Sequence, residues 1–318
     1  MAVLDSRGRI RGKIGNVVYR TVGNTSIIQS RPGKVRQTLS TRESALEFGL
    51  VSNCGRILRD LYSTFTSYSD GRLLNRMNAA LLKCLRDTDM PRGERDLHDG
   101  NPEHLQGLQF NINSPLTEAL AVRPECVLEE GKVRVHIPEF REYGQLQQPR
   151  HSKACVLRMM VAAINFREGY YEYLAYKDIA IERGATVPQQ HWQPEVALPA
   201  GSMVLVSVSL HYFGMRDING YRPTINSVAC SPAEIIGAFK VADRKEEQVE
   251  PEQDVVANRH PLINYRGSEI LNKISGKRKQ DKKYQERLVR NKTGSEPVKA
   301  VEAESNLPVT GKVFYRKE

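Results

Sequence analysis

Lys132-Val133-Arg134-Val135-His136-Ile137 is a stretch in which polar and apolar residues alternate without a break. Because successive side chains of a strand point to opposite faces, this period of two predicts a β-strand with one buried face. Four later segments are rich in β-branched, apolar and aromatic residues and are predicted as further strands: residues 155–166, 170–181, 203–213 and 235–241. Many short strands separated by turn residues are typical of a sandwich. We therefore predict an immunoglobulin-like antiparallel β-sandwich over residues 127–242.

Upstream of the sandwich, apolar residues recur every three or four positions, which is the period of an amphipathic helix. The first set is Leu46, Leu50, Cys54, Ile57, Leu58, Leu61 and Phe65, and the second is Leu73, Leu74, Met77, Ala80, Leu81, Cys84 and Leu85. Ser40 and Glu43 fit a capping box at the start of the first helix. Since only a short break at Ser69-Asp70-Gly71 separates the sets, we predict an antiparallel helical hairpin over residues 38–87. Prolines and glycines then predict an irregular linker over residues 88–126.

Residues 1–37 combine two β-type runs with a dense set of positive charges. The runs 14–22 and 25–29 flank Gly23-Asn24, a pair that tolerates the backbone of a tight turn, so we predict a basic β-hairpin arm. Its candidate polyanion-binding residues are Arg7, Arg9, Arg11, Lys13, Arg20, Arg31, Lys34 and Arg36. A basic two-stranded ribbon can follow a phosphate backbone or enter a major groove. The alternative is that these charges only solvate an edge strand and prevent aggregation.

The last segment, residues 243–318, is rich in charge and poor in apolar residues, which predicts a charged, largely disordered tail with a transient helix around residues 280–289. Near its end, Gly311-Lys312-Val313-Phe314-Tyr315-Arg316 resembles the first hairpin strand, which begins Gly12-Lys13 and ends Tyr19-Arg20. One interpretation is that so short a match arises by chance. The other is that residues 311–316 form a terminal assembly strand, with Lys312, Val313, Phe314 and Tyr315, that pairs with the hairpin edge within one chain or between chains.

The composition limits the class of protein. The chain has 318 residues, enough for two domains of ordinary size, and its net charge of +10 favours polyanionic partners. Five cysteines stand singly, with no Cys-x-x-Cys pair, which predicts reduced, buried thiols. No apolar run approaches the ~18 residues of a spanning helix, and no secretory pattern begins the chain. We therefore expect a cytoplasmic protein with no membrane insertion.

The usual catalytic and metal-binding patterns are missing from the sequence. None of the seven histidines forms an i, i+4 pair, and the glycines around Gly8 and Gly15 lack the ending of a phosphate-binding loop. We predict that His98-Asp99 is solvated in a loop and that His191-Trp192 is a strand-edge pair. The sequence therefore predicts a protein that is not an enzyme and that needs no cofactor or metal.

A set of motifs in the N-terminal part resembles an uncharacterised bacterial protein family that has no assigned activity. The motifs are Gly12-Lys13-Ile14-Gly15, Thr41-Arg42-Glu43, Glu47-Phe48-Gly49, Leu58-Arg59 and Gly107-Leu108-Gln109-Phe110-Asn111. The family pattern has Asn where this chain has Ser44, and Phe-Glu where it has Leu108-Gln109. The resemblance covers about residues 8–115 and implies an architecture but no active site. It leaves the roles of Arg42, Glu43 and Glu47 open, the simplest being a salt bridge between hairpin and helix.

The expected fold class is α+β: the hairpin arm, the helical hairpin, the sandwich and the tail. Two functions fit this organisation. The first is a non-enzymatic structural or assembly protein, a homo-oligomer that self-associates through β-strand addition and docks acidic partners. The alternative is a nucleic-acid-binding protein that uses the basic N-terminal hairpin; neutralising about six phosphates would give a slope of roughly −5 for log affinity against log salt.

Overall fold

A five-stranded antiparallel sheet is the central layer of one of two compact units, residues 1–274; residues 275–318 form the other. The computed structural model describes residues 2–6, 8–22, 24–31, 33, 38–66, 68–218, 220–243, 259–262 and 267–293. The central strands lie in the order β13 (Ala233–Lys240), β12 (Met203–Phe213), β8 (Ala154–Asn165), β9 (Tyr170–Ile181) and β14 (Arg259–Pro261). The four predicted strands in this region are all present, with bounds shifted by at most two residues. Helices and antiparallel sheets occur together, which confirms the α+β class.

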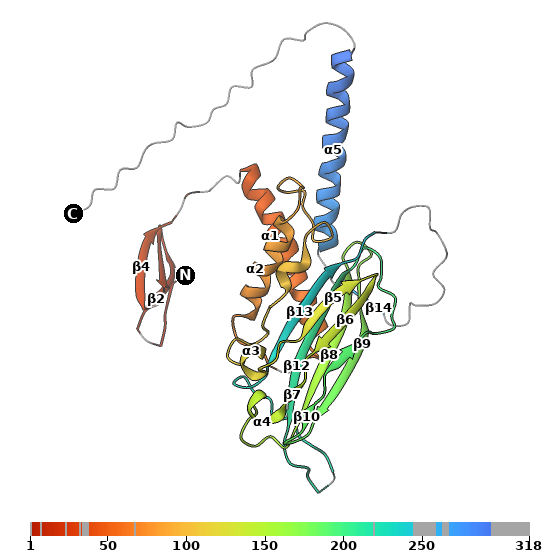
Figure 1. Ribbon diagram of the computed structural model, residues 1–318. Helices are drawn as coiled ribbons and strands as arrows, with labels where there is room; N and C mark the ends of the chain where they lie inside the picture. Colours follow the sequence, from red (N-terminus) through yellow and green to blue (C-terminus); the bar gives the residue numbers. More distant parts are fainter. Residues whose placement is uncertain are drawn as a thin grey trace, which may run out of the picture. The chain divides into compact units, whose positions relative to one another are not determined.

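Two helices cover one face of this sheet, α1 (Leu39–Tyr62) and α2 (Leu73–Arg86) (Figure 1). Their apolar stripes share a core with the sheet, in which Leu58 and Leu81 are packed together with Ile164. The predicted helices are therefore both present. The predicted capping box is wrong, because Thr38 is the N-cap of α1 and accepts a hydrogen bond from the N–H of Thr41 at 3.2 Å. Ser40 lies inside the first turn instead.

A three-stranded sheet packs on the opposite face of the central sheet. Its order is β11 (Gln190–Trp192), β6 (Lys132–Ile137) and β5 (Glu125–Glu129). The alternating segment behaves as predicted, since Val133 and Val135 are buried against Val206 in a second core, whereas Lys132 and Arg134 are exposed. Short elements complete this side: β7 (Phe140–Arg141), α4 (Glu142–Gln145) and β10 (Thr186–Val187). Two sheets that share a core fit a β-sandwich, and its immunoglobulin-like character stays a prediction.

The segment predicted as an irregular linker is part of the core. It contains a 3-10 helix, η1 (Pro102–Leu105), and a short helix, α3 (Leu116–Ala119). The N–H of Gly107 donates to the carbonyl of Ile235 at 2.8 Å, and the N–H of Phe110 donates to that of Ala233 at 2.9 Å. Phe110 is 1% exposed. The linker prediction is thus wrong over residues 102–110, because this backbone satisfies its polar groups along the edge of β13.

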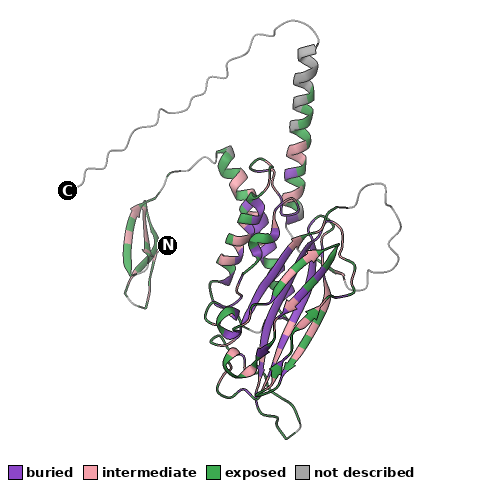
Figure 2. Cartoon of the chain, in the orientation of Figure 1, coloured by how far each residue is buried: buried purple, intermediate pink, exposed green. Residues whose placement is uncertain are grey.

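The N-terminal residues form a four-stranded sheet, whereas a two-stranded hairpin was predicted. Its strands are β1 (Ala2–Leu4), β2 (Ile10–Ile14), β3 (Val17–Val22) and β4 (Thr25–Ser30), paired in that order and all antiparallel. A turn at Gly15-Asn16, where Gly15 has a φ of +56°, divides the run that was predicted as one strand. Figure 2 shows this sheet in the colours of exposed and intermediate residues, with none of the buried class.

The tail prediction is wrong for part of residues 243–318. Residues 259–261 form β14, which pairs with β9, and α5 (Gly267–Thr293) is a long helix. Ile274 is 1% exposed, and Ile270 and Leu271 pack against the core shared with α1 and α2. These few apolar residues anchor the start of α5, although charged residues dominate the segment. Residues 294–318, with the predicted strand 311–316, lie outside the described residues.

All five cysteines are free, and Cys54, Cys84 and Cys155 are buried, as predicted. Burial raises the pKa of Cys84, Cys126 and Cys155 to about 12, so these thiols stay protonated at neutral pH. Among the described helices, none is long and apolar enough to cross a membrane.

Candidate functional site

The N-terminal sheet has two chemically different faces. Residues that lie directly opposite one another in an antiparallel pair share a face. Tyr19 lies opposite both Gly12 and Ile28, and Lys13 lies opposite Val18. The register therefore divides the strands into an apolar face (Ala2, Leu4, Ile10, Gly12, Ile14, Val17, Tyr19, Thr21, Ser26, Ile28 and Ser30) and a basic face (Val3, Arg11, Lys13, Val18, Arg20, Val22, Thr25, Ile27 and Gln29).

The basic face gathers three of the eight predicted polyanion-binding residues, Arg11, Lys13 and Arg20, and all three are exposed. The Nε of Arg11 lies 3.3 Å from Asp5 Oδ2, and Nη2 of Arg20 donates to Gln29 Oε1 at 2.8 Å. These contacts fix the two guanidinium groups without removing them from solvent. Of the other candidates, Arg9 precedes β2 and Arg31 follows β4; Arg7, Lys34 and Arg36 lie outside the described residues.

One edge of the sheet is formed by β4. Among the described strands, β4 pairs only with β3, over its whole length from Thr25 to Ser30. The other edge, β1, has three residues. The outward backbone groups of β4 are thus the longest edge that the sheet offers to a further strand. The predicted assembly residues Lys312, Val313, Phe314 and Tyr315 lie outside the described residues, so their pairing stays a prediction.

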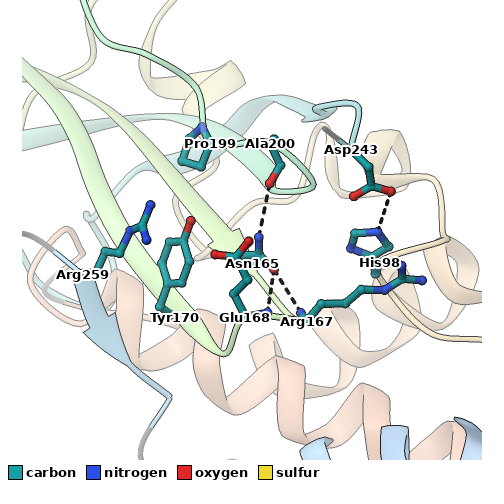
Figure 3. A pocket seen from close by; sticks show the side chains of 9 residues that line it. All are labelled: His98, Asn165, Arg167, Glu168, Tyr170, Pro199, Ala200, Asp243 and Arg259. Atoms are coloured by element: carbon teal, nitrogen blue, oxygen red, sulfur yellow. Dashed lines mark hydrogen bonds and ion pairs between the residues drawn. The ribbon is translucent and has the colours of Figure 1, made fainter. Parts of the chain in front are cut away.

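A polar pocket of about 230 Å³ lies in the larger body of the chain (Figure 3). Its lining residues are His98, Asn165, Arg167, Glu168, Tyr170, Pro199, Ala200, Asp243 and Arg259. The Asn165 amide is used structurally, because its Oδ1 accepts from the N–H groups of Arg167 and Glu168, at 3.1 and 2.9 Å, and its Nδ2 donates to the Ala200 carbonyl at 3.2 Å. The guanidinium carbon of Arg259 lies 4.3 Å from the centre of the Tyr170 ring.

The structure overturns the prediction that His98 is solvated. Its side chain is 2% exposed, and its Nε2 lies 3.1 Å from Oδ2 of Asp243. Partial burial acts to raise the pKa of Asp243, but the hydrogen bond with His98 and the nearby cations outweigh it, so the pKa lies below its ordinary value. The lining residues include no serine, threonine or cysteine that this pair could activate.

A second polar cluster spans three strands of the central sheet. Arg158 of β8 makes a bidentate pair with Asp178 of β9, with contacts of 2.8 and 2.7 Å, and Ser209 Oγ lies 2.9 Å from His211 Nε2 on β12. Burial and the nearby Arg158 cation lower the pKa of His211 to about 4, so the imidazole is neutral at pH 7. Since the charges of Arg158 and Asp178 neutralise each other, this cluster satisfies polar groups within the sheet.

The acidic residue Glu47 of α1 contacts a loop, and the predicted salt bridge from hairpin to helix is not the contact that it makes. Glu47 is 2% exposed and accepts from the N–H of Gly93 at 3.0 Å, with Arg95 Nη1 3.6 Å away. In the same loop, Arg92 donates to the hydroxyls of Ser40 and Ser44 at 2.7 and 2.6 Å. These bonds hold residues 92–95 on the first turns of α1.

His191 and Trp192 lie on β11, an edge strand of the three-stranded sheet, as predicted. The His191 ring stacks on His136 of the neighbouring strand with 4.8 Å between ring centres. Within the part of the chain that the structure describes, no group of three His, Cys, Asp or Glu residues could hold a metal ion.

No protein-family model matches the chain, and no curated protein matches it in sequence. The resemblance to an uncharacterised bacterial family therefore stays a prediction. The apolar face could not be read from the periodicity, because β1 has three residues and β2 has five, one of them Gly12. A register count outward from the Gly15-Asn16 turn could have found it, since that turn places Ile14 and Val17 opposite each other.

Proposed function

We propose that this chain is a non-enzymatic structural or assembly protein that self-associates through β-strand addition and docks acidic partners. The observation that carries the proposal is the N-terminal sheet, which has an open edge along β4 and positive charges on one face. The two stacked sheets that follow later in the chain, taken as an immunoglobulin-like sandwich, would supply a rigid body for such an assembly.

Strand addition is supported by the length and the chemistry of the two segments. The six residues of β4, Thr25–Ser30, match the six residues of the tail segment 311–316. An incoming strand gains a row of main-chain hydrogen bonds, which supply affinity, while alternate side chains supply specificity. If the strand comes from a neighbouring chain, each chain has one donor and one acceptor, and repetition builds an oligomer.

Docking of acidic partners is supported by the basic face. Arg11 and Lys13 lie two residues apart on β2, ~6.6 Å, and Arg20 lies on the same face of the neighbouring strand β3, one strand spacing of ~4.8 Å away. Exposed cations in such an array attract an acidic surface and speed its encounter, an effect that salt screens. The partner of this face is therefore expected to be an acidic protein or another polyanion.

Truncation of the tail tests the strand addition. A chain that ends at Leu307 lacks segment 311–316 and is expected to lose its oligomers, because the β4 edge then has no donor strand. A chain that ends at Arg316 retains the segment and is the matched control; it should keep the mass of the full chain. The masses are measured by light scattering after size-exclusion chromatography. Equal masses for the two truncated chains would contradict strand addition by the tail.

The second candidate function is nucleic-acid binding through the basic face. It is favoured by the alignment of Arg11, Lys13 and Arg20 on one side of a β-ribbon, a geometry that can follow phosphates. With three phosphates neutralised, log affinity for duplex DNA would fall against log salt with a slope of about −3. The triple variant Arg11→Ala, Lys13→Ala, Arg20→Ala should then lose binding.

A control for charge alone is available elsewhere on the chain. The triple variant Lys132→Ala, Lys153→Ala, Arg183→Ala removes the same net charge from three exposed positions outside the N-terminal sheet. If the two triple variants bind DNA and RNA equally across a salt series, the basic face has no specific role in nucleic-acid binding. If neither nucleic acid binds while the protein still forms oligomers, the assembly function is favoured.

A further inference from the structure

We propose that the apolar face of the N-terminal sheet packs face to face on the same face of a second copy of this chain. This inference rests on the self-association proposed above, but it assigns a different surface: a sheet face, where strand addition uses the β4 edge.

The apolar face exposes large side chains from three of its strands. Leu4 is 66% exposed, Ile10 41%, Ile14 55% and Ile28 67%. Tyr19 lies between them, in the row that joins Gly12 to Ile28 across three strands. Exposed apolar side chains that gather on one face of a sheet make that face a candidate contact site. A sheet of four short strands also needs a hydrophobic face covered to be stable by itself.

The charge distribution favours a second copy of the chain as the partner that covers the apolar face. The apolar face carries no charged residue, so its own copy can cover it without removing any charge from water. The opposite face carries Arg11, Lys13 and Arg20, and two such faces would repel each other. Two copies related by a two-fold axis bring the same patch of each copy together, so that the interface is self-complementary. Sheets that stack in this way lie ~10 Å apart.

The size of the face limits the strength of the contact. With strands ~4.8 Å apart and ~3.3 Å per residue, the face covers roughly 350 Å². Two copies would bury roughly 700 Å², below the ~1,200 Å² at which standard stable interfaces begin. The dimer is therefore weak by this face alone and its population depends on protein concentration, so association is measured between about 1 and 100 µM.

Neighbouring residues on opposite faces provide the test. Leu4→Lys and Val3→Lys place the same charge on the same strand at positions of nearly equal exposure, 66% and 65%, but Leu4 lies on the apolar face and Val3 on the basic face. Ile28→Lys repeats the change on β4. Mass is measured by sedimentation equilibrium across the concentration range, with circular dichroism to check that each variant is folded.

Leu4→Lys and Ile28→Lys are expected to weaken association at least about a hundredfold, whereas Val3→Lys should associate like the parent chain. Unchanged association of Leu4→Lys overturns the face-to-face contact. If the chain that ends at Leu307 dissociates in the same measurements, strand addition is still supported. Equal weakening by Val3→Lys also overturns the face-to-face contact, since charge alone would be the cause. If Leu4→Lys lowers the thermal stability without changing the mass, the apolar face packs against another part of its own chain. That result also overturns the contact with a second copy.

Discussion

Replacing Asp70 with asparagine is expected to lower the free energy of unfolding by about 3–5 kcal/mol, the range found when one partner of a buried ion pair is removed. The Asp70 side chain is 5% exposed and makes a bidentate pair with Arg76, with contacts of 2.7 and 2.6 Å. It also accepts from the N–H of Arg72 at 2.8 Å and from that of Ile112 at 3.1 Å. An asparagine keeps the shape of the side chain but turns one acceptor into a donor that faces other donors.

The contribution of Asp70 to the free energy of unfolding decreases as the pH falls. The hydrogen bonds from Arg76, aided by those from Ile112 and Arg72, outweigh burial and hold the pKa of Asp70 well below its ordinary value. A depressed pKa contributes stability above the unfolded-state pKa, ~3.9, and that contribution is lost as pH falls below it. The difference in the free energy of unfolding between Asp70→Asn and the parent chain should therefore be largest at pH 7 and should decrease progressively below about pH 4.

Urea unfolding at pH 7 and at pH 3 measures both parts of this prediction. Asp60→Asn is the matched control, since Asp60 is 62% exposed and lies 3.8 Å from Arg56 within α1. Exposed pairs of this type contribute about 0–1 kcal/mol, so the control should change little. A loss below 1 kcal/mol for Asp70→Asn at pH 7 would contradict the structural role of this carboxylate.

The substitution Gly100→Ala is expected to cost about 2–3 kcal/mol through a backbone clash. A Cβ at position 100 would lie 2.5 Å from the carbonyl oxygen of Cys84 and 2.9 Å from its carbonyl carbon. That carbonyl also accepts from the N–H of Asn101 at 3.2 Å, and Cys84 is fully buried, so the helix end has little room to move away. The clash would separate residues 100–101 from the end of α2.

Gly71→Ala is the control for this substitution. A Cβ at Gly71 would meet nothing within 4 Å, and its φ lies outside the left-handed region. The free energy of unfolding of Gly71→Ala should stay within about 0.5 kcal/mol of the parent chain, or rise slightly because alanine restricts the unfolded state. Thermal melts compare the two variants. Equal stability for both would show that residues 100–101 do not approach α2 as described.

The central strands and the helices α1 and α2 were predictable because each is long enough for its period to show. β9 and β12 have the predicted bounds, Tyr170–Ile181 and Met203–Phe213. The segment around Phe110 was not predictable, because its hydrogen bonds go to β13, more than a hundred residues away along the chain. The start of α5 was missed for a different reason: two apolar residues, Ile270 and Leu271, pack it against the core, and composition averages over them.

The candidate site was predictable only in part. Arg11, Lys13 and Arg20 are visible in the sequence as charges, but their common face follows from the strand register that the turn at Gly15-Asn16 sets. A shift of one residue in that register would exchange the two faces. The pair His98 and Asp243 left no local pattern, since 145 residues separate its members.

Sedimentation equilibrium on the full chain and on a chain that begins at Thr38 tests most directly whether the N-terminal sheet is the assembly element. The shortened chain keeps the cap of α1 and both cores but lacks all four N-terminal strands. We expect the full chain to gain mass with concentration and the shortened chain to remain a monomer throughout. Equal masses for the two chains at every concentration would contradict an assembly role for this sheet.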